Sequence, residues 1–279
     1  MKRTVASAPR LLLWLWLAAV IVGAFEYAPL AAKFIGQSSR ILFFHVPMAW
    51  AAFTAFITAG VYSLLYLFGR RPPGSLRQAR HDRAARAAIE VGLLFGVLAT
   101  VTGAVWSRIM WGAYWNWDPR QTSIVMALIF YGAYLALRDS VEDAEKRARL
   151  AAAYAALGLV VTPFFFFVVP RITFSLHPEP VINARGRIEM NPRMLQVLLA
   201  SGAGFTALFF WLHDLRTRVL TLAERALEAA AAGAYPADAA NVASALGARA
   251  SAAPHPNPSD PRGAGAADPV APSPRTSNW

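Results

Sequence analysis

The ten residues from Trp111 to Arg120 combine four large aromatic side chains with one carboxylate and one guanidinium. The aromatic and charged members of this segment are Trp111, Tyr114, Trp115, Trp117, Asp118 and Arg120. Tryptophan and tyrosine gather at membrane surfaces for general reasons, but that tendency does not explain four aromatics in seven positions followed by two charges. Aromatic faces bind a flat apolar plate, and arginine donors bind carboxylates. The segment therefore predicts a binding surface for a flat, hydrophobic molecule that carries acid groups.

Two of the five histidines could bind a metal beside this surface. His81 and His255 lie in polar segments, and His213 lies at the end of an apolar segment, where a polar residue suits a helix terminus. His45 and His177 differ, because each lies at the edge of an apolar segment. Imidazole is a usual axial ligand of haem iron, and two imidazoles at one level could hold the iron from both faces. Together with the aromatic segment, they indicate a haem site.

The composition is typical of a protein embedded in a membrane. Hydrophobic residues make up 56% of the chain and charged residues 15%, and the mean hydropathy is +0.38. Soluble domains carry a larger charged fraction, about a quarter. Six apolar segments predict membrane helices, at 11–30, 42–68, 88–106, 122–137, 151–169 and 194–212. We therefore expect an all-α integral membrane protein with six transmembrane helices.

Lysine and arginine fall mainly on one side of this arrangement. Alternate segments, beginning with the N-terminus, carry 19 basic residues, and the other segments carry 8. The positive-inside rule then places both termini in the cytoplasm and the aromatic segment outside the cytoplasmic membrane. Counting about 20 residues back from Gly69 reaches about residue 50, so His45 lies about 7–8 Å above the hydrocarbon core. His177 follows the fifth span, so we expect both histidines on the outer face.

Charge and cysteine content exclude several functions, and the composition of the C-terminal region indicates the domain organisation. The net charge is +11, but most basic residues lie in short loops, where topology and contact with anionic lipid account for them without nucleic acid. The absence of cysteine excludes disulfides, thiolate metal sites and covalent haem attachment to this chain. Residues 1–213 form the predicted six-helix domain. Residues 214–279 are expected to contain a cytoplasmic helix, at about 214–232, and a disordered Ala/Pro/Gly-rich tail.

The aromatic segment, extended to Ser123, closely resembles the tryptophan-rich "WWD" signature of proteins that handle haem in cytochrome c maturation. Two further stretches are similar to the histidine motifs of the CcmC branch of this family: Phe-His-Val-Pro-Met-Ala-Trp at 44–50, and Ser-Leu-His-Pro at 175–178. Six helices also fit CcmC and are too few for the larger CcmF-type proteins. The resemblance covers about residues 10–213.

The resemblance implies a role for each matching residue. His45 and His177 correspond to paired axial ligands of the iron, and Arg120 matches the basic position of the signature. Trp111, Trp115, Trp117 and Asp118 fall on its haem-contacting positions, with Tyr114 at a position that is often tryptophan. It also implies that haem b is held non-covalently, in transit, and passed to the haem chaperone CcmE, in concert with an ABC transporter formed by CcmA and CcmB. No bond-making residue is implied.

Other departures leave a second function open. Pro178-Glu179-Pro180 differs from the Gln-Gly pattern that follows the second histidine in typical CcmC proteins. The sequence Trp-Asp-Pro-Arg at 117–120 leans toward the CcsA branch. The alternative is therefore a CcsA-like component of a cytochrome c synthase that acts with a ResB-type partner. A plain b-type electron carrier is a third possibility, but its ligands should lie within the bilayer.

Overall fold

A computed structural model of the protein describes residues 8–31, 35–69, 75–177 and 187–231. The departures at 178–180 and the predicted disordered tail, from residue 232 onward, lie outside the described residues. Two compact units are recognised, residues 1–225 and 226–279. The first contains the helical bundle and all of the predicted site residues.

Every regular element among the described residues is helical. Helix α2 spans Ala8–Val22 and ends in a π turn at Gly23–Tyr27. A 3₁₀ segment at Gly36–Ile41 leads into α3, Leu42–Phe68, and α4 spans Leu76–Trp111. Helix α5 spans Pro119–Ser140, and α6 spans Ala144–Pro163. A π turn at Phe164–Val168 joins α6 to the short α7, Val169–Ile172, and α8 spans Pro192–Ala231.

Among the described residues, six stretches of helix are long and apolar enough to cross a membrane, which confirms the predicted number. The segment predicted at 42–68 gives the bounds of α3, and the one predicted at 11–30 ends beyond Tyr27. The other four predicted segments mark the apolar middles of longer helices, because polar capping groups lie outside those middles. Ser75, Asp118 and Asp143 each accept a backbone N–H at the start of α4, α5 and α6. The helix predicted at 214–232 is the continuation of α8, which runs through residue 213 without a break. The domain boundary at 213 stays a prediction.

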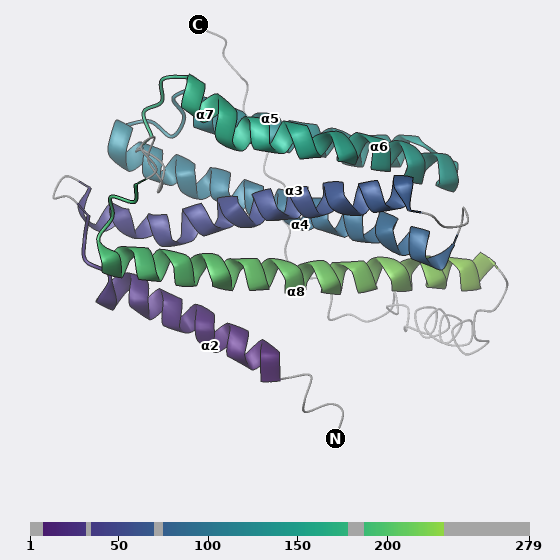
Figure 1. Ribbon diagram of the computed structural model, residues 1–279, viewed down its shortest axis with the longest axis horizontal. Coiled ribbons are helices and arrows are strands. Elements are labelled where there is room, and N and C mark those ends of the chain that lie inside the picture. The colour runs from purple at the N-terminus through teal and green to yellow at the C-terminus, as the bar shows by residue number, and fades with distance from the viewer. Residues whose placement is uncertain (1–7, 32–34, 70–74, 178–186, 232–279) are drawn as a thin grey trace, which may run out of the picture. The chain divides into compact units, whose positions relative to one another are not determined.

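The long helices of the bundle run side by side, with α5 and α6 on one side of α3 and α4 and with α8 on the other (Figure 1). Small residues line the contacts, since alanines such as Ala52, Ala55 and Ala88 are fully buried between helices. The ring of Phe56 on α3 stacks on Tyr131 of α5, with centroids 3.8 Å apart. Close approach of this kind is how helices associate without a hydrophobic driving force between them.

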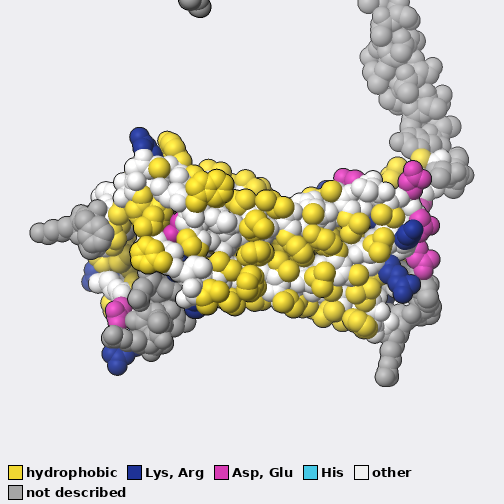
Figure 2. All heavy atoms as spheres, turned by 90° about the horizontal axis from the view of Figure 1, so that it is seen from above, with side chains coloured by type: hydrophobic (Ala, Val, Ile, Leu, Met, Phe, Trp, Pro, Cys, Tyr) yellow, Lys and Arg dark blue, Asp and Glu magenta, His cyan; other side chains and the backbone are white. Residues whose placement is uncertain are grey.

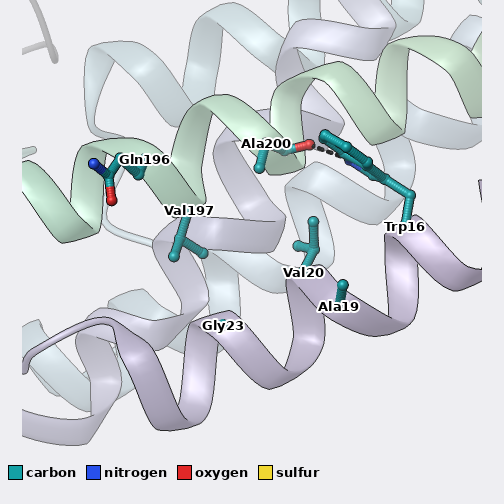
Figure 3. Close-up of a pocket in the computed structure, with 7 residues that line it drawn as sticks. All are labelled: Trp16, Ala19, Val20, Gly23, Gln196, Val197 and Ala200. Carbon is teal, nitrogen blue, oxygen red and sulfur yellow. Dashed lines mark hydrogen bonds between the residues drawn. The ribbon is translucent and has the colours of Figure 1, made fainter.

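Helix α2 lies against α8 with fewer buried side chains than the other spans. Trp16 Nε1 donates to the carbonyl oxygen of Ala200 at 2.8 Å (Figure 3). Tyr27 Oη donates to Gln196 at 2.8 Å. Small and apolar side chains between the two helices leave a cavity of about 220 Å³. No histidine and no residue of the aromatic segment lines this cavity. It is therefore separate from the predicted site.

Charged side chains gather toward the two ends of the bundle, and hydrophobic side chains cover its middle (Figure 2). Near the start of α4, Asp82 accepts two hydrogen bonds from Arg138 of α5, at 2.6 and 2.8 Å. Glu90 pairs with Arg86 and with Arg216 of α8 in the same region. We call this region, defined by these five residues, the ion-pair end. The predicted site residues belong to the opposite end of α4.

Candidate functional site

His45 lies in the first turn of α3 and contacts the last third of α4. Its Nδ1 atom is 3.1 Å from the Thr102 hydroxyl. That hydroxyl donates its own proton to a backbone carbonyl, with Leu98 O at 2.8 Å and Ala99 O at 3.1 Å. It is left to accept from His45, so His45 carries its proton on Nδ1 and a lone pair on Nε2. Gly103 lies beside the ring, where an added Cβ would come within 2.8 Å of His45 Cε1.

His177 is held by Asp118, the residue that caps α5. The Nδ1 atom of His177 is 2.8 Å from Asp118 Oδ1. The carboxylate also accepts from the Ser175 hydroxyl at 3.0 Å, from Leu176 N at 2.6 Å and from Arg120 N at 2.9 Å. Because an ionised carboxylate can only accept, His177 carries its proton on Nδ1 and presents the lone pair of Nε2.

The charge states of this pair agree with that arrangement. Burial raises the pKa of Asp118. The backbone N–H groups of Arg120 and Leu176, together with His177 and Ser175, lower it by more than burial raises it, so the pKa of Asp118 lies below its ordinary value. Burial lowers the pKa of His177, and the charge of Asp118 only partly offsets this. Near neutral pH the pair is therefore a carboxylate and a neutral imidazole.

The same end of α4 contacts both histidines. Trp106 is one turn beyond Thr102, or about 6 Å along the helix axis. Its ring centroid lies 6.3 Å from that of His177, and the Trp111 centroid lies 5.1 Å from it. Trp106 and Trp111 also contact each other edge to face at 5.2 Å. We call this region, with His45, Thr102, Trp111, Asp118 and His177, the histidine end.

The other aromatic residues of the predicted surface point elsewhere. Trp115 and Trp117 form a second edge-to-face pair, with centroids 5.9 Å apart. Trp117 is 77% exposed and has a φ of 56°, in the left-handed region that costs energy for a bulky residue. Tyr114 is 61% exposed and lies near the guanidinium of Arg108. The aromatic side chains thus form two groups: the half-buried pair of Trp106 and Trp111 beside His177, and a more exposed group around Trp117.

Buried polar side chains hold this segment in place. Asn116 donates through Nδ2 to the hydroxyl of Ser107 at 2.9 Å and through its backbone N–H to Gln121 at 2.9 Å. Ser107 donates to the Ala113 carbonyl at 2.7 Å. Gly112 ends α4 with a φ of 78°, which glycine adopts without strain. The loop is therefore a built structure rather than a flexible linker.

Arg120 carries a hydrogen-bonding group without a protein partner among the described residues. Its Nε atom is buried and has no hydrogen-bond partner, although its backbone N–H donates to the carboxylate of Asp118, the N-cap of α5. Arg171, at the end of α7, donates to the Phe167 carbonyl at 2.9 Å and lies over the Phe167 ring. A buried donor without a partner is costly, so Arg120 is suited to an acceptor supplied by a ligand.

The structure brings His45, His177, Trp111 and Asp118 to one end of α4. Asp118 does not lie on the surface of the site, because it is 3% exposed and its carboxylate is occupied by protein donors. Sequence reasoning missed Thr102, Trp106 and Ser175. The only signal for Ser175 was its position two residues before His177, and nothing in the sequence marks Thr102 as a partner of His45.

Comparison with known proteins identifies the family of the chain. The family model for CcmC, heme exporter protein C, matches residues 2–232. Heme exporter protein C of Bradyrhizobium diazoefficiens is 33% identical over 232 residues, covering 81% of this chain and 85% of the relative. The Rhodobacter capsulatus protein of that name is 32% identical, with 78% and 90% covered, and the Escherichia coli K12 protein is 30% identical, with 75% and 83% covered. The chain therefore belongs to the CcmC family, the haem-handling, multi-pass membrane proteins called heme exporter protein C in cytochrome c maturation.

Proposed function

We propose that this protein holds haem b non-covalently between His45 and His177 at the outer face of the cytoplasmic membrane, and passes it to a CcmE-type haem chaperone. The observation that carries this proposal is the state of the two imidazoles. Each has its Nδ1 proton engaged by the protein, with Thr102 or Asp118, and each leaves the Nε2 lone pair available. That is the form in which histidine binds a metal.

The surroundings fit the remaining parts of a haem molecule. Trp111 borders His177, and Tyr114, Trp115 and Trp117 extend the aromatic surface away from it. These rings suit the apolar macrocycle. The unpaired Nε of Arg120 suits a propionate, which supplies the charged acceptor that the protein does not. When bound, the haem supplies the iron that the two imidazoles coordinate.

The proposed orientation rests on the distribution of basic residues. The positive-inside rule places both termini in the cytoplasm and the histidine end outside the membrane. Haem held there would be accessible to a chaperone on the outer side. The exposed Trp117 and Phe174, which is 89% exposed, offer apolar surface for such a partner. We place CcmA- and CcmB-type transporter subunits in the same exporter system on family grounds alone.

Haem content tests the proposal. The purified protein should carry haem with the absorption spectrum of two histidine ligands, and the double variant His45→Ala/His177→Ala should lose it. His81→Ala is the matched control, because His81 lies in the first turns of α4, at the ion-pair end, and should leave haem content unchanged. A double variant that keeps the wild-type haem content and spectrum would show that the ligand assignment is wrong.

Gene neighbourhood tests the choice of partner. The match to CcmC over residues 2–232 favours transfer to a chaperone over the synthase alternative. Neighbouring genes for CcmA-, CcmB- and CcmE-type proteins are therefore expected. A ResB-type partner gene in their place would contradict the proposed transfer.

A further inference from the structure

The two histidines of the candidate site have chemically different partners. His177 donates to an ionised carboxylate, whereas His45 donates to a neutral hydroxyl. Hydrogen bonds to ionised groups are about twice as strong as those between neutral groups. The N···O distances follow the same order, 2.8 Å to Asp118 and 3.1 Å to Thr102. The two imidazoles are therefore not equivalent as ligands.

Asp118 is itself fixed in position by groups on both sides of the site. It accepts from Arg120 N at the start of α5, and from Ser175 and Leu176 in the segment that carries His177. It is nearly inaccessible to solvent, so none of these bonds competes with water. The ring of His177 cannot rotate without breaking its bond to this carboxylate. The His177 segment and the start of α5 are therefore joined through one carboxylate.

His45 has no ionised group behind its ring. Its hydrogen-bonding partners are the Thr102 hydroxyl, which is already committed to a carbonyl of α4, and the backbone of Ala99, and both are neutral. A carboxylate behind a metal-binding histidine raises the basicity of the imidazole and fixes its orientation, whereas a hydroxyl does so weakly. An iron held by both rings should therefore be bound more strongly by His177.

We propose that Asp118 is a positioning residue that makes His177 the retained iron ligand and His45 the ligand that is exchanged during transfer. This proposal rests on the proposed function. In the exchange, the bond from iron to His45 Nε2 would break, and a bond from iron to a ligand atom of the acceptor would form. No electron is transferred, and His45 returns to the neutral state it has before haem binds. The acceptor must therefore approach from the His45 side.

Ring tautomers test the role of Asp118 without haem. In the haem-free protein labelled with ¹⁵N-histidine, the resonances of His177 can be assigned by their loss in His177→Ala. We expect Nδ1 to carry the proton in the wild type. Asp118→Asn should shift His177 toward the Nε2–H tautomer, because the amide can donate to Nδ1. Asparagine still caps α5, so the fold should persist.

Haem dissociation tests the difference between the ligands. His45→Gly should keep most of its haem, with an open position that added imidazole fills, whereas His177→Gly should lose haem. Asp118→Asn should weaken haem binding about 10–100-fold, as for other groups behind metal ligands. Ser175→Ala and Thr102→Val are matched controls and should have smaller effects, since each keeps the carboxylate behind His177.

The outcomes separate this inference from the proposed function. Equal haem loss in His45→Gly and His177→Gly would overturn the inference but leave the haem site intact. An unchanged His177 tautomer in Asp118→Asn would also overturn it. If Asp118→Asn fails to fold, the comparison of the two glycine variants decides. A wild-type protein that binds no haem would instead overturn the proposed function.

Discussion

The two ends of α4 use polar side chains in opposite ways. At the ion-pair end, Asp82 is bound by both terminal nitrogens of Arg138, and Glu90 lies between Arg86 and Arg216. At the histidine end, one carboxylate accepts from four donors, while the Nε2 lone pairs of the two imidazoles have no donor and the Nε–H of Arg120 has no acceptor among the described residues. The ion-pair end also contains buried groups without a partner among the described residues, His81 Nδ1 and Arg83 Nε. The contrast therefore lies in its paired carboxylates and arginines, which stabilise the bundle, and in the imidazole lone pairs of the histidine end, which leave bonding capacity for a ligand.

The backbone shows the same contrast. The helices at the ion-pair end begin with regular caps, at Ser75 for α4 and Asp143 for α6. The histidine end contains Trp117 in a left-handed conformation, and Trp117 is the only residue other than glycine with a positive φ in the described part of the chain. Residues held in such conformations cluster at functional sites. The comparison therefore assigns stability to one end and binding to the other.

The largest expected effect is at the ion-pair end. Arg138→Ala leaves Asp82 as a buried charge without its main partner, because the two side chains are 8% and 11% exposed. We expect a loss of about 3–5 kcal/mol in the free energy of unfolding. Thermal unfolding in detergent measures this. The haem affinity of the folded fraction should stay at the wild-type value. A selective loss of haem affinity would show that the ion-pair end also contributes to binding.

Arg120→Gln should act at the histidine end alone. Removing the guanidinium removes a charge-assisted hydrogen bond to the proposed propionate, worth about 1.5–3 kcal/mol, or about 10–100-fold in haem affinity. Haem titration monitored by absorbance checks this. Arg120→Lys should recover only part of the affinity, since a lysine cannot reproduce the fork of donors. Equal affinity in the wild type and Arg120→Gln would contradict the assigned contact.

Gly103→Ala tests whether haem binding requires close packing against the His45 ring. The new Cβ would meet the imidazole at 2.8 Å, so the ring must shift from its position. We expect a cost of about 1–3 kcal/mol in stability, with weaker haem binding. Gly132→Ala is the matched control on α5, because nothing lies within 4 Å of its added Cβ. If both variants bind haem alike, close packing against His45 is not required.

The smallest effect is expected from the pair between Arg83 and Glu224, in which only Glu224 is exposed. Their N···O distance is 2.6 Å, but the Glu224 side chain is 48% exposed, so water screens the interaction. Arg83→Ala should therefore cost at most about 1 kcal/mol in unfolding free energy. A loss as large as that of Arg138→Ala would show that burial does not separate the pairs at this end.

The helices were predicted more fully than their ends. The six apolar segments identified every span, because a membrane helix requires a contiguous apolar stretch. The segment predicted at 42–68 matches α3 at both ends, and the one predicted at 11–30 runs past the end of its span at Tyr27. The other four fall short, as at Leu76 and Trp111 for the segment predicted at 88–106. Helix ends depend on capping side chains and on packing of neighbouring helices, which an apolar window does not register.

The sequence by itself determined the helical membrane fold, the family, and the residue types of the candidate site. These features depend on local composition and on contiguous motifs, such as the segment from Trp111 to Arg120. The tertiary structure alone decided which atoms meet. It paired His45 with Thr102 and His177 with Asp118, across 57 and 59 positions of the chain, and it turned Asp118 inward. Such contacts depend on how α3, α4 and α5 pack, and side-chain packing between distant segments leaves no pattern in a single sequence.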